Sequence, residues 1–226
     1  AELHAAVQAA TPKALRLEAL VALGQGRDAS LSSEVTPLVR DADLELRTQA
    51  AESLGLLAEP GSLGALLAAF ADAPPPLLKV ALAGALRQLR EPRGEQYLTA
   101  ALSAQDPMVQ FNAALILCED SATPQAAQLL RRYLQHARPP EEVQQQLLAC
   151  LAQGGDGGAR QSLIERARGL GPERLPAAAR LLQLGEESGR WMLRRAARQG
   201  GPEGLIAARW LAGTAARWLA GADEQN

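Results

Sequence analysis

The sequence predicts an all-α protein, an α/α solenoid (superhelix) of about seven stacked helix pairs. Three observations predict this fold class. Apolar residues recur at i, i+3, i+4 and i+7, the period of a helix, and no segment alternates with period two as a strand does. Related segments return every 29 to 34 residues along the chain. Prolines punctuate the same period at the predicted helix starts, where a missing N–H leaves no hydrogen bond unmade.

The first helix of each unit is predicted from five segments that align with one another: "LRLEALVALG", "LRTQAAESLG", "LKVALAGALR", "VQFNAALILC" and "VQQQLLACLA". Their second position holds Arg16, Arg47, Lys79, Gln110 and Gln144, in steps of 31, 32, 31 and 34 residues. A helix pair of this length cannot bury its apolar faces alone, so a constant spacing predicts stacked copies.

The second helix of each unit is predicted from a separate series of paired residues, which are Leu66-Leu67, Tyr97-Leu98, Leu129-Leu130, Leu163-Ile164 and Met192-Leu193. Pro60, Pro92 and Pro124 precede second helices at a spacing of 32 residues. The two series predict a single domain, 1–226, with repeats at about 11–40, 41–71, 72–103, 104–135, 136–168, 169–198 and 199–222.

The segment "LRTQAAESLG" at 46–55 carries a basic residue, then Ala-Ala, then Leu-Gly. This first-helix pattern resembles the HEAT-repeat family, in particular its short bacterial repeats of the phycobilin-lyase type. The resemblance covers about 14–213 and weakens in the last two units. It implies an α-solenoid whose second helices line the concave surface, and it implies no particular activity.

The segment "AARWLAGTAARWLAG" at 207–221 repeats one heptapeptide around Thr214. A period of eight turns each copy by about 80°, so one continuous helix would not align Trp210 with Trp218. We therefore expect two short antiparallel helices that fold back at Gly213-Thr214. Both tryptophans would fill the end of the core, or would form an apolar end that docks another chain.

No motif for catalysis or for metal binding is found. Cys118 and Cys150 form no Cys-x-x-Cys pair and are expected to be separate buried apolar residues, with a bridge or a reactive thiol as the alternative. His4 and His136 lack metal-ligand spacing. We expect no enzyme activity, cofactor or membrane span. A cytoplasmic location is favoured, while a processed N-terminus at Ala1 would fit the periplasm.

Charge is distributed unevenly along the chain. Residues 1–113 carry a net charge of −4 and residues 114–226 a net charge of +2. The segment 160–217 contains eleven arginines and only five glutamates. The register of second helices places Arg132, Arg166 and Arg195 in one row. On the helix "GRWMLRRAAR", Trp191 falls within the arc of arginines. The candidate binding residues are Arg131, Arg132, Arg166, Trp191, Arg194, Arg195 and Arg198. The alternative is a solvated face with local glutamate partners, with Trp191 packed on the next repeat.

These features favour a non-enzymatic scaffold that binds a protein partner, one with an acidic surface, through the concave second-helix face. A second hypothesis is a nucleic-acid-binding protein resembling HEAT-like DNA glycosylases. The net charge of −2 and the presence of only two lysines count against it. A third hypothesis, a lyase-like chromophore-binding protein, follows from the repeat subtype alone.

Overall fold

The computed structural model of the protein describes residues 11–26, 29–118 and 123–223, and for 213–223 it describes the backbone only. Every regular element in these ranges is a helix, and none of the described residues belongs to a strand. Within each unit, helices that are close in sequence pack against one another. The predicted all-α solenoid is therefore confirmed. The chain divides into two compact units, Ala1–Leu117 and Cys118–Asn226, and each is described here by itself.

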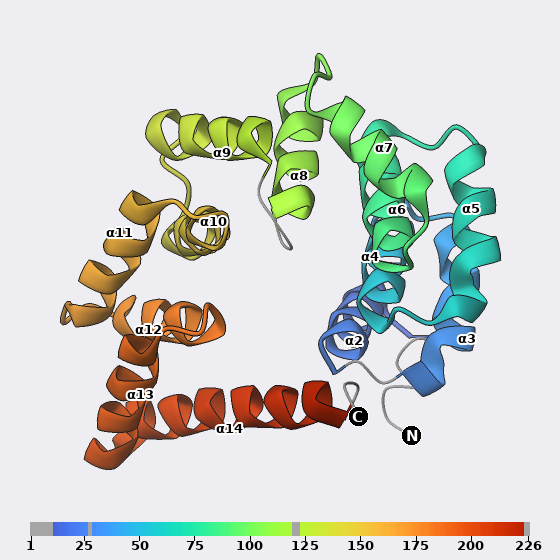
Figure 1. The fold of residues 1–226 in the computed structure, drawn as a ribbon. Helices are drawn as coiled ribbons and strands as arrows, with labels where there is room; N and C mark the ends of the chain where they lie inside the picture. Colours follow the sequence, from blue (N-terminus) through green and yellow to red (C-terminus); the bar gives the residue numbers. More distant parts are fainter. Residues whose placement is uncertain (1–10, 27–28, 119–122, 224–226) are drawn as a thin grey trace. The chain divides into compact units, whose positions relative to one another are not determined.

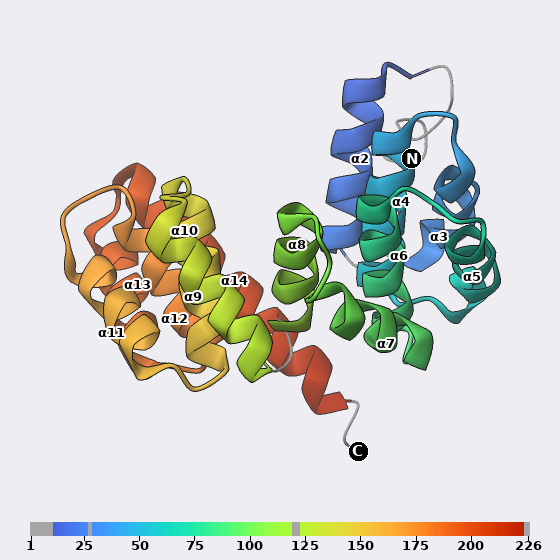
Figure 2. The same cartoon turned by 90° about the horizontal axis from the view of Figure 1, so that it is seen from above.

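The first unit contains the first helices α2 (Lys13–Gly26), α4 (Leu44–Leu57) and α6 (Pro76–Gln88), and α8 (Pro107–Cys118) begins in it. Between them lie α3 (Ser32–Val35), α5 (Leu63–Ala71) and α7 (Pro92–Ala101), with short 3-10 turns before α3 and α5 and after α3. Helix α4 packs between α2 and α6, as Figures 1 and 2 show.

Close approach of the first helices in this unit depends on the Leu-Gly part of the repeat pattern. A Cβ atom on Gly55 of α4 would lie 2.9 Å from the Cα atom of Ala85 in α6. A Cβ atom on Gly24 of α2 would lie 3.2 Å from the Cα atom of Ser53 in α4. The absence of side chains at these glycines lets the backbones of adjacent first helices meet.

The second unit contains α9 (Pro124–His136), α10 (Glu141–Gln153), α11 (Gly157–Arg168), α12 (Arg174–Gln183), α13 (Glu187–Gln199) and α14 (Gly201–Asp223). Helix α11 packs against α10, α12 and α13, and α14 packs against α12 and α13. In Figure 1, α9, α11 and α13 form the outer row of this unit, and α10 and α12 lie inside it. The second helices therefore do not line the inner side here, contrary to the expectation.

A register of small residues in the second helices was missed by the sequence analysis. In five second helices, α5, α7, α9, α11 and α13, the third residue is buried and small, where α5 is counted from the 3-10 turn before it. These residues are Ser62, Gly94, Ala126, Ala159 and Gly189. A Cβ atom on Gly94 would lie 2.4 Å from the carbonyl oxygen of Ala83, and one on Gly189 would lie 2.5 Å from that of Ala178. Helices α7 and α13 thus cross the first helices of their own pairs, α6 and α12, at this position.

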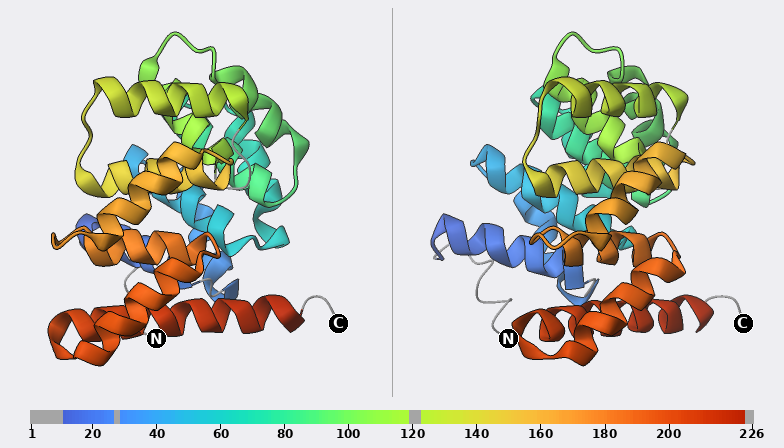
Figure 3. Two further views of the ribbon diagram at one scale, coloured as in Figure 1. Left: turned by 60° about the vertical axis from the view of Figure 1, so that its left-hand side comes forward. Right: turned by 90° about the vertical axis from the view of Figure 1, so that its left-hand side faces the viewer.

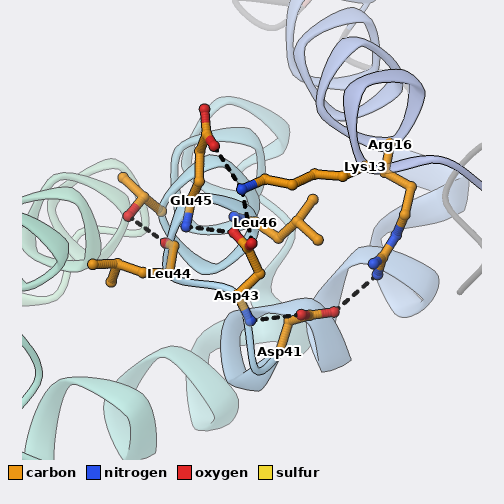
Figure 4. A network of polar contacts seen from close by, with 8 residues as sticks. Lys13, Arg16, Asp41, Asp43, Leu44, Glu45 and Leu46 are labelled. Atoms are coloured by element: carbon orange, nitrogen blue, oxygen red, sulfur yellow. Dashed lines mark hydrogen bonds and ion pairs between the residues drawn. The ribbon is translucent and has the colours of Figure 1, made fainter.

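A polar network joins the first two repeats (Figure 4). The guanidinium of Arg16, only 8% exposed, donates to a carboxylate oxygen of Asp41 at 2.9 Å. The other oxygen of Asp41 accepts the backbone N–H of Asp43 at 2.9 Å. The Asp43 side chain caps α4 by accepting the N–H groups of Glu45 and Leu46. The basic residue of the repeat pattern therefore holds the connection to the next helix pair.

The carboxyl groups at these loop positions predict a dependence of stability on pH. The backbone N–H of Ala159 and then the Arg131 guanidinium lower the pKa of Asp156. The N–H of Asp43 and then Arg16 lower the pKa of Asp41. Because the folded pKa lies below the unfolded value of about 3.9, the stabilisation is present above about pH 4 and is lost as the pH falls through the folded pKa.

We expect the Asp156→Asn variant to unfold at a lower temperature than the wild type at pH 7. The difference between the two melting temperatures should shrink as the pH is lowered below about 4. Asparagine keeps a side-chain oxygen for the helix cap but carries no charge for Arg131. Thermal denaturation followed by circular dichroism across this pH range measures the effect. A constant difference at every pH would show that Asp156 does not contribute through its ionised form.

The doubled heptapeptide lies in one continuous helix, α14, whose range Gly201–Asp223 includes Gly213 and Thr214. Figures 1 and 3 show this helix as an unbroken coil. The predicted fold-back into two short helices is wrong. Alanine, leucine and arginine are strong helix formers. Their combined helix propensity outweighs the cost of Gly213, which is about 1 kcal/mol relative to alanine. Trp210 is half-buried, and the side chain of Trp218 lies outside the described residues.

The two cysteines are joined by a disulfide, and both are buried. The expectation of two separate thiols is therefore wrong. Cys118 ends α8 and Cys150 lies in α10, both are assigned to the second unit, and their Cα atoms are 5.6 Å apart. Their separation of 32 residues is close to one repeat. In a repeat protein, equivalent positions of consecutive repeats tend to lie close together, so this spacing was the signal for a bridge.

Candidate functional site

A hollow of about 200 Å³ lies among α11, α12 and α13 of the second unit. Its apolar lining is made of small and medium side chains, which are Ala167, Leu170, Leu175, Ala178, Met192 and Ala196. Each of these three helices also contributes an arginine: Arg168 from the last turn of α11, Arg174 from the first turn of α12 and Arg195 from α13. The hollow thus combines an apolar surface with cationic groups.

Trp191 borders this hollow and also a second, shallower one lined by Arg194, Arg195 and Arg198. Its side chain is 59% exposed. The guanidinium carbon of Arg195 lies 5.5 Å from the centre of the indole ring, within the range of a cation–π contact. The tryptophan therefore lies on the surface among arginines.

The amphipathic character predicted for α13 is confirmed by its burial. Leu193 and Ala196 are buried, while Trp191, Arg194 and Arg198 are exposed. The predicted alternative of local glutamate partners holds for Arg190, which pairs with Glu187 at 3.4 Å. The exposed face of α13 carries the remaining arginines.

Four arginines around Trp191 have no acidic partner within the described ranges: Arg168, Arg194, Arg195 and Arg198. Arg174, by contrast, forms an ion pair with Glu203 of α14. We call the set Arg168, Trp191, Arg194, Arg195 and Arg198 the arginine–tryptophan surface. Among the described residues, no carboxylate of this unit engages these guanidinium groups, and an unpaired guanidinium can bind a carboxylate or a phosphate.

Two of the predicted site residues are engaged within the protein. The guanidinium of Arg131 binds Asp156, the N-cap residue of α11, at 2.6 Å. Arg166 binds Glu141 of α10 and donates to the side-chain oxygen of Gln144 at 2.9 Å. These two arginines tie α11 to α9 and to α10. Arg132 is exposed on α9, and it has no ion pair among the residues that the structure describes.

The predicted row of Arg132, Arg166 and Arg195 therefore contains three different environments. Arg132 is exposed to solvent, Arg166 is hydrogen-bonded to α10, and Arg195 contacts Trp191. Three further lining residues were not predicted from the sequence: Arg168, Arg174 and Leu170. These come from the ends of α11 and α12 and from the loop between them. The sequence feature that could have indicated this part of the site is Leu170, a leucine between two glycines. In the structure Leu170 is 96% exposed.

In the described part of the chain, no group of three or more histidine, cysteine, aspartate or glutamate side chains is arranged to hold a metal ion. No described helix combines the length and the apolar character that a membrane span requires. The lining residues of the two hollows include no serine, cysteine, histidine, aspartate or glutamate.

Helix pairs that pack on their sequence neighbours define an α-solenoid repeat protein. The family model for HEAT repeats matches residues 1–87 and 63–152. The chain belongs to the HEAT-repeat family, and the resemblance inferred from "LRTQAAESLG" is confirmed. Proteins of this fold are helical scaffolds that often bind other proteins.

Solved structures with a similar fold include the complex of CpcE and CpcF of phycocyanin lyase from Nostoc sp. PCC7120. The match has 16% identity and a TM-score of 0.51, and it covers 94% of this chain and 93% of that chain. Human deoxyhypusine hydroxylase matches with 17% identity and a TM-score of 0.40, over 94% of this chain and 82% of that chain. At 16% identity, the likeness to the Nostoc complex shows the fold alone. No curated protein matches the sequence.

Proposed function

We propose that this protein is a non-enzymatic scaffold that binds a protein partner with an acidic surface through the arginine–tryptophan surface. One observation carries the proposal. Four arginines without acidic partners in the described ranges surround a tryptophan that is 59% exposed. Arginine and tryptophan are the residue types that most often dominate binding energy in protein interfaces.

The chemistry of the lining residues supports binding rather than catalysis at this site. General acid–base or nucleophilic catalysis needs a titratable side chain or a nucleophile within reach of the reacting atoms. The two hollows offer arginine, tryptophan, glutamine, methionine and small apolar residues. Guanidinium groups stay protonated and bind planar anions with two hydrogen bonds.

The sizes of the two hollows do not decide the chromophore hypothesis. Sites for small molecules and cofactors usually enclose about 300–1,000 Å³. The hollow among α11, α12 and α13 has about 200 Å³, and the second one, lined by Arg194, Arg195 and Arg198, has about 390 Å³. The likeness to the Nostoc complex shows the fold alone at 16% identity. The protein-partner hypothesis is favoured by the residue types at the site, arginine and an exposed tryptophan.

The test is affinity capture from a lysate of the source organism, with the full chain as bait. Arg194→Glu/Arg198→Glu should lose proteins that the wild type retains, since like charges across an interface oppose association. Arg90→Glu/Arg209→Glu is the matched control. It changes the net charge by the same amount at two exposed arginines that likewise lack an ion pair in the described ranges, and it should retain the same proteins.

Equal retention by both double variants, or equal loss, would contradict the proposed site. The competing nucleic-acid hypothesis is tested with labelled duplex DNA at about 50 and 200 mM salt. Tight binding at the higher salt that Arg194→Glu/Arg198→Glu abolishes would favour DNA over a protein. We expect only weak retention that disappears at the higher salt.

A further inference from the structure

The hollow beside Trp191 differs from the rest of the arginine–tryptophan surface because its lining is largely apolar. Ala167, Ala178 and Ala196 contribute small side chains that are buried at this point. Leu170 borders the hollow with 96% of its surface exposed, and Trp191 borders it with 59% exposed. Covering large apolar side chains of this kind is favourable at roughly 25 cal/mol per Å². An occupant that covers them must itself be apolar.

The charges around the hollow require a second property of the occupant. Arg168 and Arg195 line the hollow without acidic partners in the described ranges, while Arg174 already pairs with Glu203. An apolar occupant without carboxylates would cover the hollow but leave two guanidinium groups partly desolvated and unpaired, which costs free energy. A phosphate chain would satisfy the arginines but leave Leu170 in water.

The volume limits the size of the apolar part. About 200 Å³ is below the usual range for cofactor and drug-sized sites, about 300–1,000 Å³, and is of the order of one large side chain. The arginines come from α11, α12 and α13, so they approach the hollow from three helices. A chain that inserts one side chain would place its flanking residues near these arginines.

We infer that the hollow receives one leucine or phenylalanine side chain from an acidic segment of the partner, with carboxylates on both sides of that residue. This inference rests on the proposed function and specifies the partner segment. The apolar residue packs against Leu170, Trp191 and the alanines. The flanking carboxylates bind Arg168 and Arg195, with two hydrogen bonds each where the geometry is bidentate.

The probe is a set of synthetic peptides: Glu-Asp-Glu-Leu-Glu-Asp-Glu, the same peptide with phenylalanine or alanine at the centre, and Ser-Gly-Ser-Leu-Ser-Gly-Ser. Binding is followed by the fluorescence of Trp191 in the full chain. The chain has three tryptophans, so Trp210→Phe and Trp218→Phe are introduced to leave Trp191 as the only reporter. Circular dichroism is used to check that this background variant is folded.

We expect the leucine- and phenylalanine-centred acidic peptides to bind at least tenfold more tightly than the alanine-centred peptide and the uncharged peptide. Leu170→Asp should remove this preference, because it places a carboxylate at the rim of the hollow. Leu205→Asp is the matched control, since Leu205 is also an exposed leucine, 76% exposed, and does not line the hollow. It should bind like the reporter background.

The outcomes separate the inference from the proposed function. Equal affinity for leucine- and alanine-centred acidic peptides would overturn the inferred anchor and leave a surface that binds by charge alone. An unchanged preference for leucine in Leu170→Asp would also overturn it. So would the absence of binding by any acidic peptide up to about 1 mM, which corresponds to a binding free energy of about −4 kcal/mol. The proposed function is judged separately by the lysate capture, in which Arg194→Glu/Arg198→Glu is the deciding variant.

Discussion

Replacing Gly189 with leucine should lower the free energy of unfolding by about 3 kcal/mol. The Cβ atom alone would lie 2.5 Å from the carbonyl oxygen of Ala178 and 2.6 Å from the backbone nitrogen of Leu182. Both atoms belong to the backbone of α12, which cannot rotate away as a flexible side chain can. Helices α12 and α13 must therefore move apart, and the packing between them is lost.

Urea denaturation followed by circular dichroism measures this loss as a lower midpoint. Gly157→Leu is the control, because it makes the same change at an exposed helix start with no atom within 4 Å of the added Cβ. It should leave the midpoint nearly unchanged, within about 0.5 kcal/mol. Equal midpoints for the two variants would mean that α12 and α13 do not cross at Gly189.

Removing the disulfide should lower the free energy of unfolding by about 3–4 kcal/mol, according to the chain-entropy model for a closed loop of this length. Cys118 and Cys150 are separated by 32 residues. The bridge restricts the unfolded chain, and without it the unfolded state gains conformational freedom. Denaturation with and without a reductant measures the difference.

The Cys118→Ser/Cys150→Ser variant should unfold like the reduced wild type and should not respond to the reductant. Alkylation of the unfolded, unreduced protein followed by mass spectrometry provides an independent check. Two alkylated thiols would contradict the bridge and would restore the prediction of two separate buried cysteines.

Helical structure and repeat spacing were predictable because both depend on local features of the chain. The apolar period follows from the geometry of a helix, and "LRTQAAESLG" shares its Leu-Arg and Leu-Gly positions with "LRLEALVALG" one repeat earlier. The error at Gly213-Thr214 arose where local signals disagree. Glycine and threonine are typical of a helix boundary, but the surrounding residues favour a helix, and α14 continues through them.

The candidate site was predicted only where a single helix contains it. Trp191, Arg194 and Arg198 lie on one face of α13, and the helical period placed them together. Leu170 and Arg168 could not be added by that period, because they come from the end of α11 and the loop that follows. Their position beside Trp191 depends on how α11 packs against α13.

The sequence by itself determined the fold class, the approximate repeat spacing and the face of α13 on which Trp191 lies. Only the tertiary structure decided which arginines are engaged within the protein. Arg131 and Arg166 are engaged by Asp156 and Glu141, each 25 residues away in the chain. The apolar period is a property of the local backbone, whereas the pairing of a charge depends on residues brought close only by folding.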